Sequence, residues 1–237
     1  MILVLAVVAG WPLLRTIWFG FTDAHLANPG GAVWVGWDNY LRHEEDAWRG
    51  LLADPLWWRA VGNTLVFTLI SVSLETLLGL VIALVLNASF ALRGWVRAAV
   101  LVPWAIPTIV SAQMWSWILN DQFGMLNDLL LNIDLIERPI SFLQGPASVV
   151  VGLVHVLIPF MVLSIASVLR SIDPQLEESA RILGAGRIKT FLKVTFPLSL
   201  DGIGTGFIIV FLLANGSFVT LLLLGGGELR TLPLLIY

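Results

Sequence analysis

The sequence has no cysteine and little charge. The absence of cysteine from all 237 residues excludes disulfide bonds and thiolate metal sites. Asp, Glu, Lys and Arg make up 12% of the chain, about half of the roughly 25% that is usual in soluble domains. Hydrophobic residues make up 58%, and the mean hydropathy is +0.90. Charge cannot cover the surface of such a chain, so we expect membrane lipid to cover much of it.

Two functional signatures are also missing. No Gly-x4-Gly-Lys-Ser/Thr segment occurs, so the chain has no phosphate-binding loop of that kind. The glycines at 225–227 are not followed by Lys and Ser/Thr, and they indicate an external turn instead. The net charge of −3, with no long basic patch, argues against a nucleic-acid partner. We predict neither a cofactor nor a metal site in this chain, and any ATP must be bound by a separate polypeptide.

Long apolar runs dominate the sequence. Crossing about 30 Å of hydrocarbon takes roughly 20 residues as a helix, which satisfies its own backbone hydrogen bonds in lipid. Four runs exceed that length, namely 60–88, 98–119, 147–169 and 202–224. A fifth run, 1–14, ends at Arg15, and 232–237 resembles the start of a sixth. The pattern predicts an all-α, polytopic helical membrane protein, a single domain over 1–237 with five spans and the start of a sixth.

The basic residues predict the orientation. Segments 89–97 and 170–201 contain seven Lys and Arg residues. Segments 22–59, 121–146 and 225–237 contain five in nearly twice the length, and eleven of the sixteen acids. Because Lys and Arg are enriched in cytoplasmic loops, we expect a cytoplasmic N-terminus, an external loop at 22–59 and a cytoplasmic loop at 171–197.

The apolar N-terminus has two interpretations. A signal peptide would need a basic first segment and a small-residue cleavage site. Residues 20–23, Gly-Phe-Thr-Asp, do not resemble such a site, so a membrane span is favoured. Since both ends of the chain lie in apolar runs, we expect a fragment of a longer protein, with a complete chain as the alternative.

The loop at 171–197 predicts two short helices joined by a turn. Asp173 and Pro174 suit a helix start, and Gly184 suits the left-handed turn that ends a helix. Leu176, Ala180 and Leu183 form an apolar stripe that either the membrane domain or a partner must cover. Glu177 and Arg181 have the spacing of an i,i+4 ion pair, and 187–194 can form a second helix before Pro197.

The same loop contains Glu178-Ser179-Ala180-x3-Gly184-x9-Val194-x-Phe196-Pro197. This resembles the E-A-A-x3-G-x9-I-x-L-P loop (the EAA loop) of bacterial ABC importer permeases, with mild differences at Ser179, Val194 and Phe196. The resemblance implies an inner-membrane permease that is not itself an enzyme. Its partners would be two ATPase subunits, a second and non-identical permease, and an extracytoplasmic solute-binding protein. The residues it implies for ATPase coupling are Glu177, Glu178, Ser179, Ala180, Gly184 and Pro197.

The transported solute is less clear from the resemblance. Segments 11–15, 20–23, 36–40, 102–107 and 120–124, with Asn127 following, resemble carbohydrate permeases. Segments 216–220 and 224–227 resemble polyamine or iron permeases instead. The carbohydrate stretch is the longer, so we expect import of a carbohydrate, with a polyamine or iron importer as the alternative.

Polar side chains within spans are candidates for the translocation path, because burying them in lipid costs free energy. Sugars bind to planar hydrogen-bonding groups and to aromatic faces. Glu75 is the only acid within a predicted span, and interhelical hydrogen bonding is its expected role. The candidates for substrate contact are Gln113, Trp117, His155, Asn215 and Ser217.

Two other classes of function remain as alternatives. A secondary transporter or channel predicts an inverted repeat and charges paired at mid-membrane. An intramembrane enzyme predicts a catalytic cluster within the spans. The sequence offers one span acid, Glu75, and one span histidine, His155, in different predicted helices, which is weak support for either class.

Overall fold

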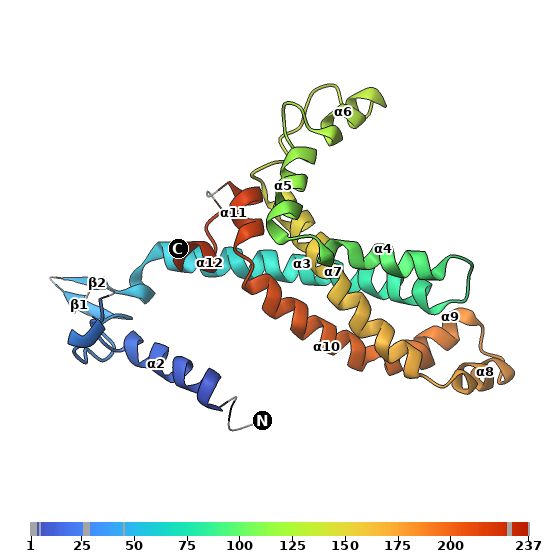
Figure 1. Cartoon of the computed structure of the whole chain (residues 1–237), viewed down its shortest axis with the longest axis horizontal. Coiled ribbons are helices and arrows are strands. Elements are labelled where there is room, and N and C mark those ends of the chain that lie inside the picture. The colour runs from blue at the N-terminus through green and yellow to red at the C-terminus, as the bar shows by residue number, and fades with distance from the viewer. Residues whose placement is uncertain (1–3, 5, 26–28, 45, 227–228, 237) are drawn as a thin grey trace. The chain divides into compact units, whose positions relative to one another are not determined.

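Helices make up nearly all of the regular structure, as the composition predicts (Figure 1). The computed structural model describes residues 4, 6–25, 29–44, 46–226 and 229–236. It divides into two units, Met1–Ala60 and Val61–Tyr237. The prediction of a single domain over 1–237 stays a prediction.

The smaller unit contains short elements, and α3 begins within it. They are η1 (Ala6–Gly10), α2 (Trp11–Gly20), η2 (Pro29–Gly31), the antiparallel strands β1 (Arg42–Glu44) and β2 (Ala47–Arg49), and η3 (Leu51–Ala53). The larger unit contains the rest of α3 (Pro55–Asn87), then α4 (Arg93–Ala105), α5 (Thr108–Ile118), α6 (Met125–Asn132), α7 (Pro146–Ser171), α8 (Pro174–Ile182), α9 (Arg187–Thr190), η4 (Phe191–Thr195), α10 (Phe196–Asn215), α11 (Val219–Gly225) and α12 (Leu232–Ile236).

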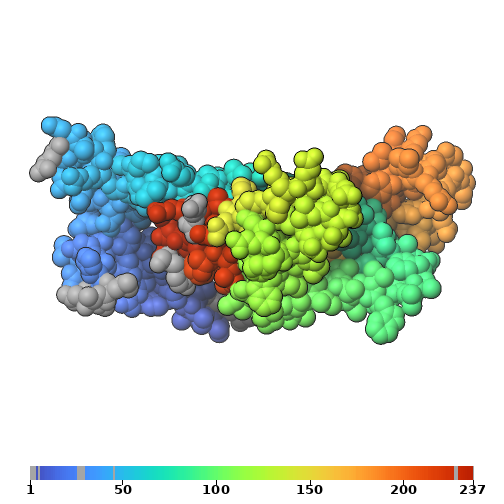
Figure 2. Space-filling model, turned by 90° about the horizontal axis from the view of Figure 1, so that it is seen from above, coloured from blue at the N-terminus to red at the C-terminus, as the bar shows by residue number. Residues whose placement is uncertain are grey.

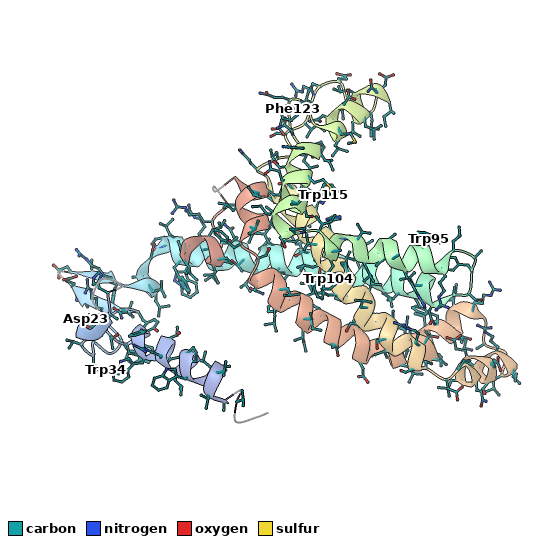
Figure 3. All side chains as sticks on the ribbon, in the orientation of Figure 1. Asp23, Trp34, Trp95, Trp104, Trp115 and Phe123 are labelled. Atoms are coloured by element: carbon teal, nitrogen blue, oxygen red, sulfur yellow. The ribbon has the colours of Figure 1, made fainter. Side chains whose placement is uncertain are left out.

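Segments 20–23 and 36–40, which carry part of the carbohydrate-permease resemblance, hold the smaller unit together. The Asn39 side-chain amide donates to the carbonyl oxygens of Gly20 and Thr22, at 3.0 and 2.8 Å. The Asp23 carboxylate accepts a hydrogen bond from the amide of Val33, beside Trp34 (Figure 3). These contacts give the two segments a structural role.

Three helices of the described part are long and apolar enough to cross a membrane, or up to four if a bent pair counts as one span. The three are Pro55–Asn87, Pro146–Ser171 and Arg187–Asn215. The prediction of five spans is therefore not confirmed. The bent pair, α4 and α5, replaces the predicted span 98–119 and turns by 97°. The break lies at Ile106, whose ψ of 131° is extended, because a following proline disfavours helical backbone.

The predicted span 202–224 was wrong at both ends. The helical backbone already begins at Arg187 and continues past Pro197, so the predicted stop before that proline is absent. A π-helical turn at Phe191–Thr195 precedes the proline, and this wider turn eases the loss of an amide donor. The helix ends at Asn215, and α11 follows as a separate piece.

The core of the larger unit lies where α7 packs against α10. A Cβ atom on Gly202 would lie 3.0 Å from the carbonyl oxygen of Ser164, and one on Gly206 would lie 2.6 Å from the sulfur of Met161. Both positions therefore need glycine for the helices to approach. Gly204, on the other side of α10, has open space around it.

Glu75 is fully buried in α3, with 0% of its surface exposed. Neither carboxylate oxygen has a hydrogen-bond partner among the described residues. The interhelical hydrogen bond that we expected for this side chain is therefore not found in the part of the chain that the structure describes.

Candidate functional site

Local hydrogen bonds define both ends of α8, the first helix of the loop at 171–197. The Asp173 carboxylate accepts from the amide of Gln175 at 3.0 Å, which confirms the predicted helix start. At the other end, the Gly184 amide donates to Arg181 O and the Ala185 amide to Ala180 O, both at 3.0 Å. This pair of bonds is a Schellman motif. Gly184 has a φ of +86°, so the predicted left-handed turn is confirmed.

Glu177 connects α8 to the base of the next apolar helix. Its carboxylate lies 3.5 Å from the Arg181 guanidinium, which confirms the predicted i,i+4 pair. It also accepts a hydrogen bond of 2.6 Å from the hydroxyl of Thr195, the last residue of η4. Sequence reasoning missed this second contact, because 18 residues separate the two side chains.

An apolar surface on this loop is left uncovered by the residues that the structure describes. We call it the docking face, and Ile182 and Leu183 are 85% and 87% exposed. Ile188 and Leu192 of this face also line a depression of about 580 Å³, together with the basic residues Arg187, Lys189 and Lys193. Figures 1 and 2 show this loop at one end of the larger unit. The docking face consists of Leu176, Ile182, Leu183, Ile188 and Leu192.

The remaining loop residues predicted for coupling are arranged around the docking face. Glu178, Ser179 and Pro197 are exposed, and Ala180 is partly buried. Glu178 makes no hydrogen bond or ion pair with another described residue. Its charge is therefore available to a partner, whereas the charge of Glu177 is used within the loop.

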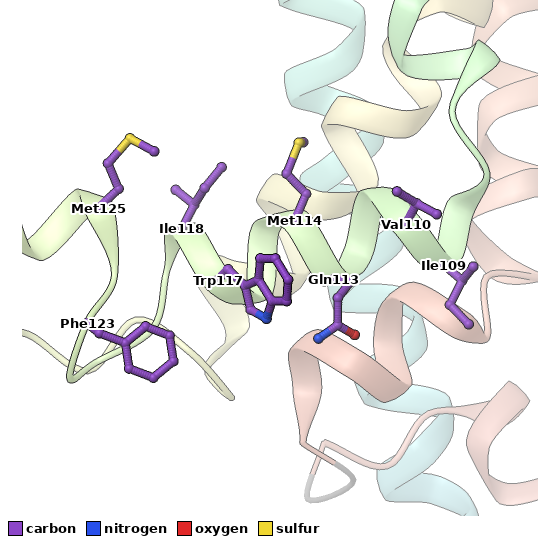
Figure 4. Close-up of a pocket in the computed structure, with 8 residues that line it drawn as sticks. All are labelled: Ile109, Val110, Gln113, Met114, Trp117, Ile118, Phe123 and Met125. Atoms are coloured by element: carbon purple, nitrogen blue, oxygen red, sulfur yellow. The ribbon is translucent and has the colours of Figure 1, made fainter.

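Two of the predicted path residues, Gln113 and Trp117, line one open pocket of about 820 Å³ (Figure 4). They are four residues apart in α5, and both are directed to the same side of that helix as Phe123. Phe123 follows α5 and had not been singled out as a path residue. The other lining residues are Ile109, Val110, Met114, Ile118 and Met125.

The other three path candidates do not line this pocket. His155 Nδ1 lies 3.0 Å from the Ser111 hydroxyl, a contact between α7 and α5, and its ring packs edge-on against Trp115. The Asn215 side chain donates to Phe211 O, within its own helix. Ser217 lies at the break between α10 and α11.

The segment 120–124 and Asn127 shape the connection after α5. The Asn127 side chain exchanges two hydrogen bonds with the backbone of Ile140, and Asp121 accepts from the Ser141 hydroxyl at 2.6 Å. A Cβ atom on Gly124 would overlap the backbone of Asn120. The side chains of Asp121 and Asn127 therefore hold the backbone of this connection. Of residues 120–124 and 127, only Phe123 lines the pocket.

The comparison with protein families settles what kind of chain this is. Residues 75–237 match the family described as "Binding-protein-dependent transport system inner membrane component". The chain belongs to this family of transport permeases. The matched segment includes α8, the docking face and the pocket of α5.

Two curated relatives of this permease differ in the solute that their names give. It is 36% identical over 191 residues to a trehalose/maltose transport system permease protein of Thermococcus litoralis, covering 79% of this chain and 61% of the relative. It is 32% identical over 192 residues to a spermidine/putrescine transport system permease protein of Escherichia coli, covering 81% and 66%. The chain thus spans about three fifths to two thirds of the length of these relatives.

A solved structure supports the fold. A chain in the crystal structure of a bacterial ABC transporter involved in import of the acidic polysaccharide alginate superposes with a TM-score of 0.69 at 21% identity. The match covers 98% of the permease and 82% of that chain. At this identity the likeness establishes the helical permease fold.

The contacts of Glu177 predict a difference between two adjacent acids. In the permease, Glu177→Ala removes the Thr195 and Arg181 contacts, whereas Glu178→Ala removes none within the described chain. A side-chain hydrogen bond to a charged group contributes about 1.5–3 kcal/mol. We therefore expect amide hydrogen exchange over 174–185 to become roughly tenfold faster or more in Glu177→Ala. Mass spectrometry would detect this. Equal exchange in the two variants would show that Glu177 does not hold the loop.

Proposed function

We propose that this permease is one of the two membrane subunits of an ATP-driven ABC importer and forms half of the path for a carbohydrate. The docking face carries the proposal. It presents large apolar side chains on and just after the capped helix α8, outside the packed core, and exposed apolar surface of this kind marks a site of protein association. The ABC relatives and the family match support an ATPase subunit as the partner.

The proposal includes the partners and the orientation predicted from the sequence. ATPase subunits dock on the loop at 171–197, a second and non-identical permease completes the path, and an extracytoplasmic solute-binding protein delivers the solute. The N-terminus and the docking face are cytoplasmic, in agreement with the distribution of Lys and Arg. ATP binds to the partner subunits, and this chain carries out no bond chemistry and needs no cofactor.

The mechanism follows from the way α8 is attached. When the ATPase subunits close, they move the docking face. The hydrogen bond between Glu177 and Thr195 transmits that displacement to the base of the Arg187–Asn215 helix. Since α10 packs tightly on α7 through Gly202 and Gly206, the two helices move together. This movement opens the path alternately to each side of the membrane.

The pocket of α5 supports a neutral solute with hydroxyl groups. Gln113 supplies a planar donor and acceptor, and Trp117 supplies an aromatic face for C–H surfaces. None of the eight described residues that line the pocket is acidic. A polyamine carries several positive charges, and burying such charges without carboxylates to pair with them costs free energy. The greater identity to the trehalose/maltose relative agrees with a carbohydrate.

Two glycines near the loop turn provide a matched test of docking. Gly184 has a φ of +86°, whereas Gly186 has a φ of −67°, and neither has a neighbour that would block a side chain. A non-glycine residue in the left-handed region costs about 1–2 kcal/mol, and more for a β-branched one. We expect Gly184→Val to reduce co-purification of the ATPase subunit and transport at least severalfold, and Gly186→Val to retain both.

The two variants would be compared after expression with all partner subunits, with the amount of permease in the membrane as the control for folding. If Gly184→Val retained both ATPase association and transport, the turn would not be needed for docking. Loss of association in both variants would show that any bulk at this surface is harmful, and the role of the turn would be contradicted.

The solute class is tested on the solute-binding protein that works with this permease. We expect its unfolding temperature to rise with di- or oligosaccharides and to stay unchanged with spermidine, putrescine or ferric ion. Binding stabilises the folded protein by about 2.7 kcal/mol when the ligand is present at 100 times its Kd, so thermal unfolding resolves the difference. A rise with polyamines or iron alone would contradict the carbohydrate assignment and leave the docking role unaffected.

A further inference from the structure

Three arginines gather at the end of the larger unit that carries the docking face. Arg93 and Arg97 lie in the first turns of α4, and Arg170 lies in the last turn of α7. The positive charges of Arg93 and Arg170 both act on Arg97. None of the three forms an ion pair with an acid of the described residues. We call these residues the arginine cluster, and its like charges have no counter-charge within that part of the chain.

Backbone contacts hold the arginines but use few of their donors. Arg93 Nε donates to Leu86 O at 2.6 Å, near the end of α3, and an Nη atom of Arg97 lies 3.5 Å from the same oxygen. Arg170 Nε donates to Ala166 O at 2.9 Å. Each guanidinium has five N–H groups. Contact with helix ends thus explains where the arginines lie, and most of their donors remain for another acceptor.

A small cleft between α4 and α7 opens beside the cluster. It has a volume of about 130 Å³. Arg97 and Arg170 are its only charged lining residues, and the remaining lining is apolar: Leu86, Val100, Leu101, Val162, Leu163 and Ala166. α7 is a candidate span, and α4 is the first half of the bent pair that passes the same test together. A cationic rim above an apolar cleft at the end of a span matches a molecule with an anionic head and a hydrocarbon tail.

We propose that Arg97 and Arg170 bind the phosphate of an anionic phospholipid, such as phosphatidylglycerol, with the upper part of an acyl chain in the cleft. Basic pockets between transmembrane helices on the cytoplasmic side are suited to such headgroups. An inorganic anion would neutralise the arginines but would leave the apolar lining uncovered. Figures 1 and 2 place the start of α4 at the same end of the unit as α8 and α9. The lipid therefore binds at the helix ends next to the docking face.

The test is a lipid titration of the natural full-length permease, assembled with its partner subunits, by native mass spectrometry. The variants are Arg97→Gln with Arg170→Gln, the charge-retaining pair Arg97→Lys with Arg170→Lys, and Arg138→Gln as a control. Arg138 is exposed in the connection between α6 and α7, distant in sequence from the cluster. Phosphatidylcholine is the neutral lipid for comparison, and unfolding temperatures without lipid check that each variant is folded.

We expect saturable binding of phosphatidylglycerol and much weaker binding of phosphatidylcholine. Each lost arginine should weaken binding about fivefold, hence roughly 25-fold for the double glutamine variant. The lysine pair should retain part of the binding, and Arg138→Gln all of it. Inorganic phosphate at the same concentration should not compete with the lipid.

Four results would overturn the proposal. Equal binding of the two lipids would remove the role of the phosphate charge. Unchanged binding in the folded double glutamine variant would place the lipid elsewhere. Competition by inorganic phosphate would assign the cluster to a free anion. Absence of lipid binding in the assembled complex would assign it to an acid of a partner subunit. None of these results bears on the docking role of α8.

Discussion

The hydrogen bond between Glu177 and Thr195 joins α8 to the Arg187–Asn215 helix, a candidate membrane span. Without it, no side-chain hydrogen bond among the described residues would join α8 to that helix, and a displaced loop would move it less. With it, α8 is linked to the Arg187–Asn215 helix, which includes η4, so that the two can move together. The Schellman turn at Gly184 has a complementary role, since it ends α8 and turns the chain toward α9. Ile182 and Leu183 are therefore exposed at a hydrogen-bonded helix end.

The same part of the molecule shows how charge is divided between structure and function. Glu177 is satisfied inside the loop, while Glu178 beside it faces outward. At the same end of the larger unit, the arginine cluster donates a hydrogen bond to the end of α3 and retains N–H donors for the proposed anionic headgroup. A lipid bound there would restrain these helix ends and so limit the movement of the docking face relative to the membrane. In contrast, Glu75 is buried without a described partner, and the contacts of the larger unit give no account of it.

Local signals made the loop at 171–197 predictable. The Asp173 cap, the left-handed Gly184 and the Glu177–Arg181 pair each depend on residues within one helical turn or a few positions. The Thr195 contact and the arginine cluster depend on tertiary packing between segments far apart in sequence, so periodicity could not reveal them. Two prolines affect their helices in opposite ways. The helix breaks before Pro107 but continues through Pro197, where a π turn precedes the proline. Residues 20–23 and 36–40, which resemble a carbohydrate-permease signature, hold backbone in place.

The absence of cysteine from the chain allows a direct test of the central claim that the docking face is cytoplasmic and covered by an ATPase subunit. A single Leu183→Cys substitution would be labelled with a membrane-impermeant maleimide in sealed vesicles of each orientation, with and without the ATPase subunits. The account predicts labelling only when the reagent is on the cytoplasmic side, and strong protection once the ATPase subunits are bound. Labelling from the external side, or labelling that the ATPase subunits leave unchanged, would contradict it.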